Sequence, residues 1–288
     1  MNLKELKIET ISRENPDFPY LLKEIPNPPS KIFVLGKLPA NSSADGPKIA
    51  IVGTRKATFE GRLIAKKIAQ RLAELKIVVV SGLAMGIDTA AHEGALAGNG
   101  ETIAVLACGL DAIYPRQNEN LAKKIIESGG AIISEYPIGT PAYPDQFLAR
   151  NRIVSGLSAA TIVIEAPIDS GALVTARLAA EQGREVLIFP GPINHPNYRG
   201  SHKLIRDGAR LVASIEDILE DLGINQISIR QLADKNQNNK LKFKNEINGI
   251  KDENQSLIIK IIQKSGRPLN IDKIIELTKL EPRVVNQS

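Results

Sequence analysis

The chain has 288 residues, of which 43% are hydrophobic, and it contains one cysteine and no tryptophan. This length fits one large domain, or one large and one small domain, with a sizeable core. The single cysteine, Cys108, excludes a disulfide framework and indicates a reducing compartment. No apolar run approaches membrane-spanning length and the first residues lack the apolar region of a signal peptide, so we expect a soluble cytoplasmic protein.

The formal net charge of +5 is unevenly distributed along the chain. Residues 1–224 hold 25 Lys and Arg against 25 Asp and Glu, whereas residues 225–288 hold 12 against 7. The overall basicity therefore says little about the main domain. A role in nucleic-acid binding has to rest on local clusters of cations.

Residues 1–47 are interrupted by prolines at positions 16, 19, 26, 28 and 29, which exclude long regular elements. We predict an extended N-terminal arm packed on the main domain, with a short edge strand at 32–35.

Residues 48–224 alternate between short apolar runs and helical patterns. Strands are predicted at 49–52, 77–80, 102–107, 131–134, 160–164 and 186–189, and helices near 61–75, 86–98, 118–128, 147–157 and 172–182. Such alternation, with continuously apolar strands, is typical of a mostly parallel, doubly wound α/β sheet covered on both faces. A helix near 215–222 closes this domain.

The remaining residues differ in composition. The segment 225–253 is rich in Asn, Gln and Lys and is predicted to be a flexible linker. Helical patterns return in 254–288, where two short helices and the start of a third resemble the front of a winged-helix module that is cut short.

The first predicted strand ends in a polar turn that opens a helix, with the sequence IAIVGTRKATFEGR from Ile49. Gly53 would let an anion approach the backbone, and Arg55 carries a fork of donors suited to phosphate. We expect the unpaired N–H groups at the helix start to assist, as at other helix N-termini. Neither the dinucleotide fingerprint nor the P-loop motif occurs.

Other turns also follow strands. The second, SGLAMGID at 81–88, suggests a shared anion pocket through its glycines, although close packing of strand on helix explains them as well. The third carries Cys108, interpreted as a small buried residue, and Tyr114 and Arg116, which could rim the pocket. Ser170 and Gly171 stand at another helix start.

Phe147, Arg150, Asn151 and Arg152 follow an irregular proline-rich loop. An aromatic ring beside two arginines suits base stacking and phosphate binding. The alternative is a core phenylalanine with arginines paired to acids. A later basic run, Arg199, Lys203, Arg206 and Arg210, lies either on the same face or on solvated surface.

Signs of catalysis are weak. The three histidines, His92, His195 and His202, lack metal-ligand spacing, and nothing marks Glu165 and Asp88 as an acid–base pair rather than structural caps. We expect no metal and no cofactor.

Several blocks together resemble the DNA-processing protein A family (DprA or Smf). They are GTRKATFEGR, SGLAMGIDTAAHEGAL, TIAVLACGLDAIYP, FLARNRIVSGLS, EAPIDSGALVTARLAAEQGREV and IRDGARLV, within residues 17–223. The resemblance implies an extended Rossmann fold that binds single-stranded DNA without hydrolysing nucleotides. It further implies a homodimer that protects incoming DNA in natural transformation and loads the RecA recombinase onto it.

Carried over by position, Arg55 is the family's phosphate-gripping arginine and Phe147 its base-stacking aromatic. The basic residue that some members carry just before that aromatic is absent here, where Tyr143, Pro144 and Asp145 stand. The expected DNA-binding residues are Gly53, Thr54, Arg55, Lys56, Ser81, Gly82, Gly86, Phe147, Arg150, Asn151, Arg152, Ser170 and Gly171.

Two rival interpretations remain. Related Rossmann proteins are nucleotide-cleaving phosphoribohydrolases with a P-G-G-x-G-T-x-x-E signature, but the corresponding segment here reads DSGALVTARLA, and Glu181 comes too late. A scaffold that engages only protein is the other. For the homodimer, the apolar stripe Ile215, Ile218, Leu219 and Leu222 is a candidate interface, unless it only covers the sheet.

Overall fold

The computed structural model describes residues 7–39, 47–224 and 271–280. The chain divides into two compact units, Met1–Ile229 and Arg230–Ser288. In the second unit the described helix is α11 (Ile271–Thr278), where a helical pattern was predicted. The predicted linker and the rest of the predicted C-terminal module lie outside the described residues.

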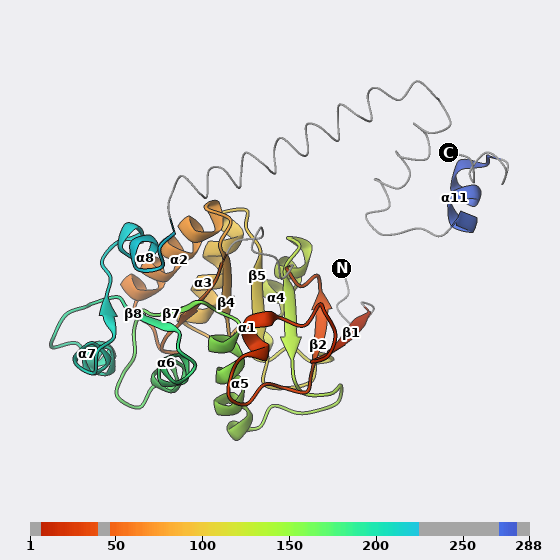
Figure 1. The fold of residues 1–288 in the computed structure, drawn as a ribbon. Helices are drawn as coiled ribbons and strands as arrows, with labels where there is room; N and C mark the ends of the chain where they lie inside the picture. The colour runs from red at the N-terminus through yellow and green to blue at the C-terminus, as the bar shows by residue number, and fades with distance from the viewer. Residues whose placement is uncertain (1–6, 40–46, 225–270, 281–288) are drawn as a thin grey trace. The chain divides into compact units, whose positions relative to one another are not determined.

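The first unit is built on one sheet (Figure 1). Its order is β1-β2-β6-β5-β4-β3-β7-β8-β9; β1 pairs antiparallel with β2 and β2 with β6, and all the other neighbours are parallel. The strands are β1 (Ile8–Ser12), β2 (Lys31–Gly36), β3 (Lys48–Val52), β4 (Val78–Ser81), β5 (Thr102–Val105), β6 (Ala131–Ser134), β7 (Ala160–Val163), β8 (Glu185–Ile188) and β9 (Arg210–Leu211).

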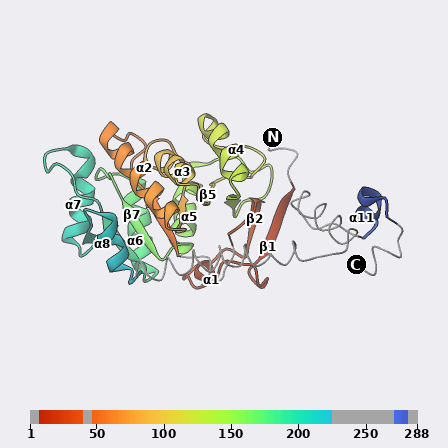
Figure 2. The ribbon, with the colours of Figure 1, turned by 90° about the horizontal axis from the view of Figure 1, so that it is seen from above.

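Helices cover both faces of the sheet. One face packs against α2 (Phe59–Glu74), α3 (Ile87–Ala97), α4 (Glu119–Glu127) and α8 (Ile215–Asp221). The other packs against α1 (Tyr20–Lys23), α5 (Pro144–Gly156), α6 (Gly171–Glu181) and α7 (Arg199–Arg206). Figure 2 shows α2, α3 and α4 together on one side of the sheet, with α1 on the opposite side.

Strand β3 shows why the apolar runs are continuous. Ile49 and Ile51 are fully buried against the layer of α2 and α3, while Ala50 and Val52 are buried in the core beneath α5 and α6. Because successive side chains point to opposite faces, a strand covered on both sides needs apolar residues throughout. The predicted doubly wound α/β class is confirmed.

The N-terminal arm was predicted incompletely. Residues 32–35 belong to β2, which is not an edge strand but lies between β1 and β6. Strand β1 was missed because its sequence, IETIS, buries only Ile11 and so lacks the apolar run of an internal strand. The arm therefore extends the sheet through β1 and β2, and it also packs on the main domain as predicted, because Phe18, Leu22 and Ile25 are buried in the core on one face of the sheet.

The predicted stripe on the closing helix is used within this unit. Ile218 and Leu219 are 0% and 3% exposed and belong to the core beside α2, and Ile215 and Leu222 pack against it. The stripe thus covers the sheet, as the alternative stated, whereas Ile215 and Leu222 remain half-buried and the interface assigned to the stripe stays a prediction.

The strand order reverses at β3, which pairs with both β4 and β7. Helices that follow β3, β4 and β5 cover one face, whereas those that follow β6, β7 and β8 cover the other. In an open α/β sheet such a switch point leaves a crevice at the carboxyl ends of the strands, where ligands bind.

Candidate functional site

A cavity of about 620 Å³ occupies this crevice. It is surrounded by the segments that follow β3, β4, β5, β6 and β7. Its lining consists of Val52, Gly53, Thr54, Arg55, Lys56, Gly82, Ala84, Asp88, Tyr114, Ala142, Pro144, Phe147, Leu148, Arg150, Asn151, Val154, Asp169, Ser170, Gly171, Ala172 and Thr175.

The turn after β3 is held by its backbone. Thr54 donates its N–H to the Glu165 carbonyl (2.7 Å), and the Thr54 carbonyl accepts from the N–H of Ile87 (3.3 Å) at the start of α3. Arg55 and Lys56 are both exposed, and neither side chain forms an ion pair with any residue that the structure describes. The turn is held by these backbone hydrogen bonds, and it presents to the cavity two cations that have no ion-pair partner among the described residues.

The start of α2 does not offer its N–H groups to a ligand, contrary to our expectation. The helix is capped by Thr58, whose hydroxyl accepts from the N–H of Gly61 (2.9 Å). The Glu165 carboxylate in turn accepts from the Thr58 N–H (2.9 Å) and hydroxyl (2.5 Å). The protein thus supplies its own anion at this helix N-terminus, where the dipole favours one.

Glu165 is fully buried and remains an acceptor. Burial raises the pKa of its carboxyl, but hydrogen bonds from Thr58, Asn197 and Tyr198 outweigh burial and bring the pKa below its usual value. Burial and this neighbouring carboxylate raise the pKa of Tyr198 to about 12. Asn197 also donates to the Lys56 carbonyl (3.1 Å), so the same network anchors the turn after β3. Glu165 is a structural anion and not a cavity residue.

Three side chains from separate loops meet at the rim. The Arg55 guanidinium carbon lies 5.0 Å from the centre of the Phe147 ring, within cation–π distance. The Tyr114 ring lies 5.5 Å from that of Phe147, tilted by 58°. Phe147 is in the first turn of α5. This helix begins at Pro144, earlier than the predicted start near residue 147. The two residues carried over from the family resemblance are in contact.

Arg150 lies at the base of the cavity and is 5% exposed. Its guanidinium donates to the carbonyl of Gly82 (2.7 Å) and to that of Val105, so it joins the ends of β4 and β5. Burial lowers its pKa, while the charge of Asp88 opposes this. Burial likewise raises the pKa of Asp88, opposed by Arg150 and by the N–H groups of Gly82 and Ala84. Nη1 makes both of these bonds and the buried Nε has no partner among the described residues, so burial and the Nη1 bonds together hold this arginine inside the protein.

The glycines of the second turn serve packing. A Cβ at Gly82 would collide with the Arg150 guanidinium, and one at Gly86 would collide with the Thr54 carbonyl. Gly86 also has a φ of +85°, which residues with a Cβ rarely adopt. The geometry supports the packing alternative that we kept open for this turn.

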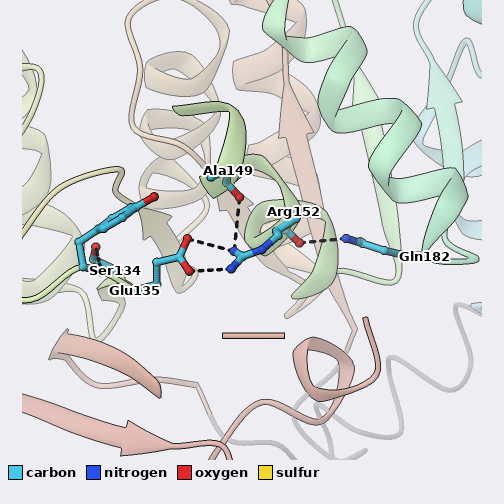
Figure 3. A network of polar contacts seen from close by, with 6 residues as sticks. Ser134, Glu135, Ala149, Arg152 and Gln182 are labelled. Atoms are coloured by element: carbon cyan, nitrogen blue, oxygen red, sulfur yellow. Dashed lines mark hydrogen bonds and ion pairs between the residues drawn. The ribbon is translucent and has the colours of Figure 1, made fainter. Parts of the chain in front are cut away.

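Arg152 is not among the cavity-lining residues, and its guanidinium lies against the Glu135 carboxylate (Figure 3). Its guanidinium donates to both carboxylate oxygens of Glu135, at 3.0 and 2.6 Å, and to the Ala149 carbonyl, while its own carbonyl accepts from Gln182 (3.1 Å). Both charged side chains are 15% exposed. A bidentate pair of this kind is a strong interaction, so this arginine is paired with an acid, as the alternative interpretation stated.

Ten of the thirteen expected residues line the cavity, and Ser81, Gly86 and Arg152 do not. The hydroxyl of Ser81 is buried and donates to the Ile51 carbonyl (2.7 Å). Ser170 caps α6 and Gly171 begins it, so the N-terminus of α6 faces the cavity. Asn151 donates its amide to the Gly171 carbonyl (3.3 Å).

The charged lining is balanced rather than strongly basic. Asp88 offsets Arg150 at the base, and Asp169, an exposed residue after β7, lines the same cavity as the two exposed cations of the turn. The sequence reasoning missed Asp169, and it missed Glu165 and Asn197 as organisers of the turn. Glu165 and Asn197 form hydrogen bonds with residues more than thirty positions away, so nothing local in the sequence indicates their role.

The histidine, cysteine and later arginine and lysine residues considered from the sequence include several that lie outside the cavity lining. His92 is fully buried, its Nδ1 is 2.8 Å from the Thr102 hydroxyl, and burial lowers its pKa to about 3. Cys108 is a buried free thiol, as predicted. Arg210 pairs with Glu185 and Asp221, and Arg199, Lys203 and Arg206 are exposed outside the cavity lining.

In the part of the chain that the structure describes, no group of three or more His, Cys, Asp or Glu side chains is placed to hold a metal ion. No described helix has the length and apolar character needed to cross a membrane.

The fold and the cavity define a Rossmann-like α/β protein with a cavity at its topological switch point. Residues 9–223 match the model of the family described as DNA recombination-mediator protein A. The chain belongs to this family, which confirms the resemblance stated from its sequence.

Named relatives agree with this assignment. The chain is 46% identical to protein Smf of Escherichia coli over 194 residues, which are 67% of this chain and 51% of that protein. It is 40% identical to the DNA processing protein DprA of Bacillus subtilis over 219 residues, 76% of this chain and 73% of that protein. The chain therefore spans about half the length of the Escherichia coli relative.

Two solved structures are similar. DprA of Streptococcus pneumoniae matches with a TM-score of 0.68 and 40% identity, covering 74% of each chain. DprA of Helicobacter pylori, described for its single-stranded DNA binding mode, matches with a TM-score of 0.67 and 31% identity, covering 77% of this chain and 98% of that one.

Proposed function

We propose that this chain binds single-stranded DNA in the cavity at the switch point. The observation that carries the proposal is the exposed, unpaired Arg55, held on a rigid turn beside two aromatic rings and across from the N-terminus of α6. The Helicobacter pylori relative, whose structure concerns single-stranded DNA binding, supports the same assignment.

The cavity suits a single strand for two reasons. Arg55, Lys56 and the start of α6 can hold phosphates, since guanidinium groups and helix N-termini both favour them. The Phe147 ring at the rim can stack only on a base that is not already paired and stacked in a duplex. Such a site binds with little sequence preference, because every base has a π-face.

We infer further, from family membership, that the chain acts as a homodimer that protects incoming DNA in natural transformation and loads RecA onto it. Ile218 and Leu219 of the α8 stripe are buried within the protomer and Ile215 and Leu222 are half-buried, so the stripe does not carry this proposal. Light scattering at micromolar concentration tests the dimer, and RecA filament assembly on strands coated with the protein tests loading.

We also propose a binding role without catalysis. Of the two carboxylates in the cavity lining, Asp88 accepts backbone N–H groups and faces Arg150, and Asp169 is exposed. Glu181, the last residue of α6, is not among the lining residues. Release of free base from a nucleoside monophosphate would contradict this proposal and favour the phosphoribohydrolase class.

The decisive experiment is a titration of labelled oligothymidylate at several salt concentrations, with a duplex of the same length as control. Affinity for the single strand should exceed that for the duplex. Its logarithm should fall linearly with the logarithm of salt, by about 0.7 per phosphate neutralised. Equal affinity for both forms, or no binding of either, would refute the proposal.

A further inference from the structure

Two aromatic side chains of the described chain line the cavity, Tyr114 and Phe147, and they differ in what covers them. The Phe147 ring is half-buried, with the Arg55 guanidinium over it at 5.0 Å. Tyr114 is 46% exposed, and its hydroxyl forms no hydrogen bond with the residues described. Its interaction in the structure is the tilted ring contact with Phe147.

This difference decides which ring is open to a base. A cation over an aromatic face occupies the surface on which a nucleobase would stack. A base that stacks there must displace Arg55 or lie on the guanidinium itself. No cation lies over Tyr114 among the described residues, so its ring offers a free flat surface.

The position of Tyr114 extends the cavity along the sheet. Tyr114 follows β5, Arg55 follows β3, and β4 lies between these strands. The residues after β4 that line the cavity between them include Gly82 and Ala84, which carry almost no side chain. Between Arg55 and Tyr114 the cavity lining from this loop is therefore small, and the exposed Met85 of the same loop lies outside the lining.

We propose that Tyr114 forms a second base-binding subsite, in which a nucleobase of a single strand stacks on the phenol ring beside the Arg55–Phe147 pair. This inference rests on the proposed single-strand binding and adds to it a named residue and the chemical group that it takes. The aromatic ring, and not the hydroxyl, makes the contact.

The test compares a short oligothymidylate with an abasic strand that has the same number of phosphates. Tyr114→Ala should weaken binding of the oligothymidylate roughly 5- to 150-fold, the range for loss of one base stack. It should leave binding of the abasic strand nearly unchanged, because no phosphate contact is lost. Tyr114→Phe should bind both strands like the parent protein, whereas Tyr114→Leu, which has no ring, should behave like the alanine variant.

A second measurement uses the absence of tryptophan in the chain. Tyr114→Trp introduces a single tryptophan, whose selectively excited emission oligothymidylate should quench by stacking and the abasic strand should not. The matched control is Tyr20→Trp, since Tyr20 is 63% exposed on α1 and outside the cavity lining. Its emission should not respond to either strand.

The outcomes separate this inference from the proposed function. If the parent protein binds neither strand, single-strand binding itself fails. If the parent binds oligothymidylate but Tyr114→Ala binds it equally well, or loses the same factor on both strands, the Tyr114 subsite is refuted while single-strand binding stands. An unquenched tryptophan at position 114 in a protein that binds would refute it too.

Discussion

Arg55 and Arg150 line the same cavity but have opposite surroundings. Arg55 is exposed on the turn after β3, and its guanidinium rests on an aromatic ring without an ion pair among the described residues. Arg150 is buried in α5, bound to the carbonyl groups at the ends of β4 and β5 and facing Asp88. The comparison teaches that proximity to a site does not make an arginine available to a ligand, because its donors can be committed inside the protein.

The largest expected effect is the loss of stability in Arg150→Ala. Removal of this guanidinium leaves two strand-end carbonyls without their donor and takes an opposite charge away from the buried Asp88, which keeps its bonds from the Gly82 and Ala84 N–H groups; this should cost about 3–5 kcal/mol in free energy of unfolding. Urea denaturation followed by far-UV circular dichroism measures the loss. Arg55→Ala serves as control and should change stability by less than about 0.5 kcal/mol. Equal stability of the two variants would show that the two environments do not differ in this way.

The second prediction concerns DNA affinity in Arg55→Ala. Loss of a charge-assisted phosphate contact, about 1.5–3 kcal/mol, should weaken oligothymidylate binding roughly tenfold to hundredfold. The slope of log affinity against log salt should become shallower by about 0.7. Arg177→Ala removes an exposed arginine of α6 outside the cavity lining and should leave both quantities unchanged. A folded Arg55→Ala protein with parent affinity would remove Arg55 from the site.

A double-mutant cycle sharpens the same contrast by testing whether Phe147 holds Arg55. The guanidinium lies over the ring, so part of the loss in Phe147→Ala should arise from a displaced arginine. The effects of Arg55→Ala and Phe147→Ala on binding should then differ from additivity by about 0.5–1 kcal/mol. Four dissociation constants measured at one salt concentration decide this. Strict additivity would mean that the two side chains act separately.

The smallest expected effect is a gain of affinity in Asp169→Asn. Asp169 is an exposed acid in a cavity that should receive phosphates, so removing its charge should tighten binding by on the order of 0.5 kcal/mol at low salt. The gain should fade as salt rises, because exposed charges are screened. Asp207→Asn makes the same change outside the cavity lining and is the control. Weaker binding in Asp169→Asn would indicate that this carboxylate contacts the ligand directly.

Much of the fold was accessible from the sequence. The six predicted strands at 49–52 through 186–189 correspond to β3–β8, and the predicted helices between them correspond to α2–α6. Local periodicity succeeds here because strands buried on both faces must be apolar throughout. Strand β1 was missed because its pairing with β2, not its own composition, makes it a strand.

Prediction of the site was more uneven. The turn at 53–56 and Phe147 were found from local patterns, and the structure places them on one cavity. The start of α2 was expected to bind an anion, but Glu165 occupies it from a segment 107 positions away. Contacts across such separations leave no trace in spacing or composition.

By itself, the sequence determined the alternation of strands and helices, the position of the polar turn after β3, and the family to which the chain belongs. The tertiary structure alone decided which charged groups are free. Arg150 and Arg152 stand two positions apart in α5, yet one is bound to strand-end carbonyls and the other to Glu135. Helical geometry points residues two positions apart to different sides of the helix. The groups that bind them lie at or just after the ends of strands far away in the sequence, and only folding brings these groups next to α5.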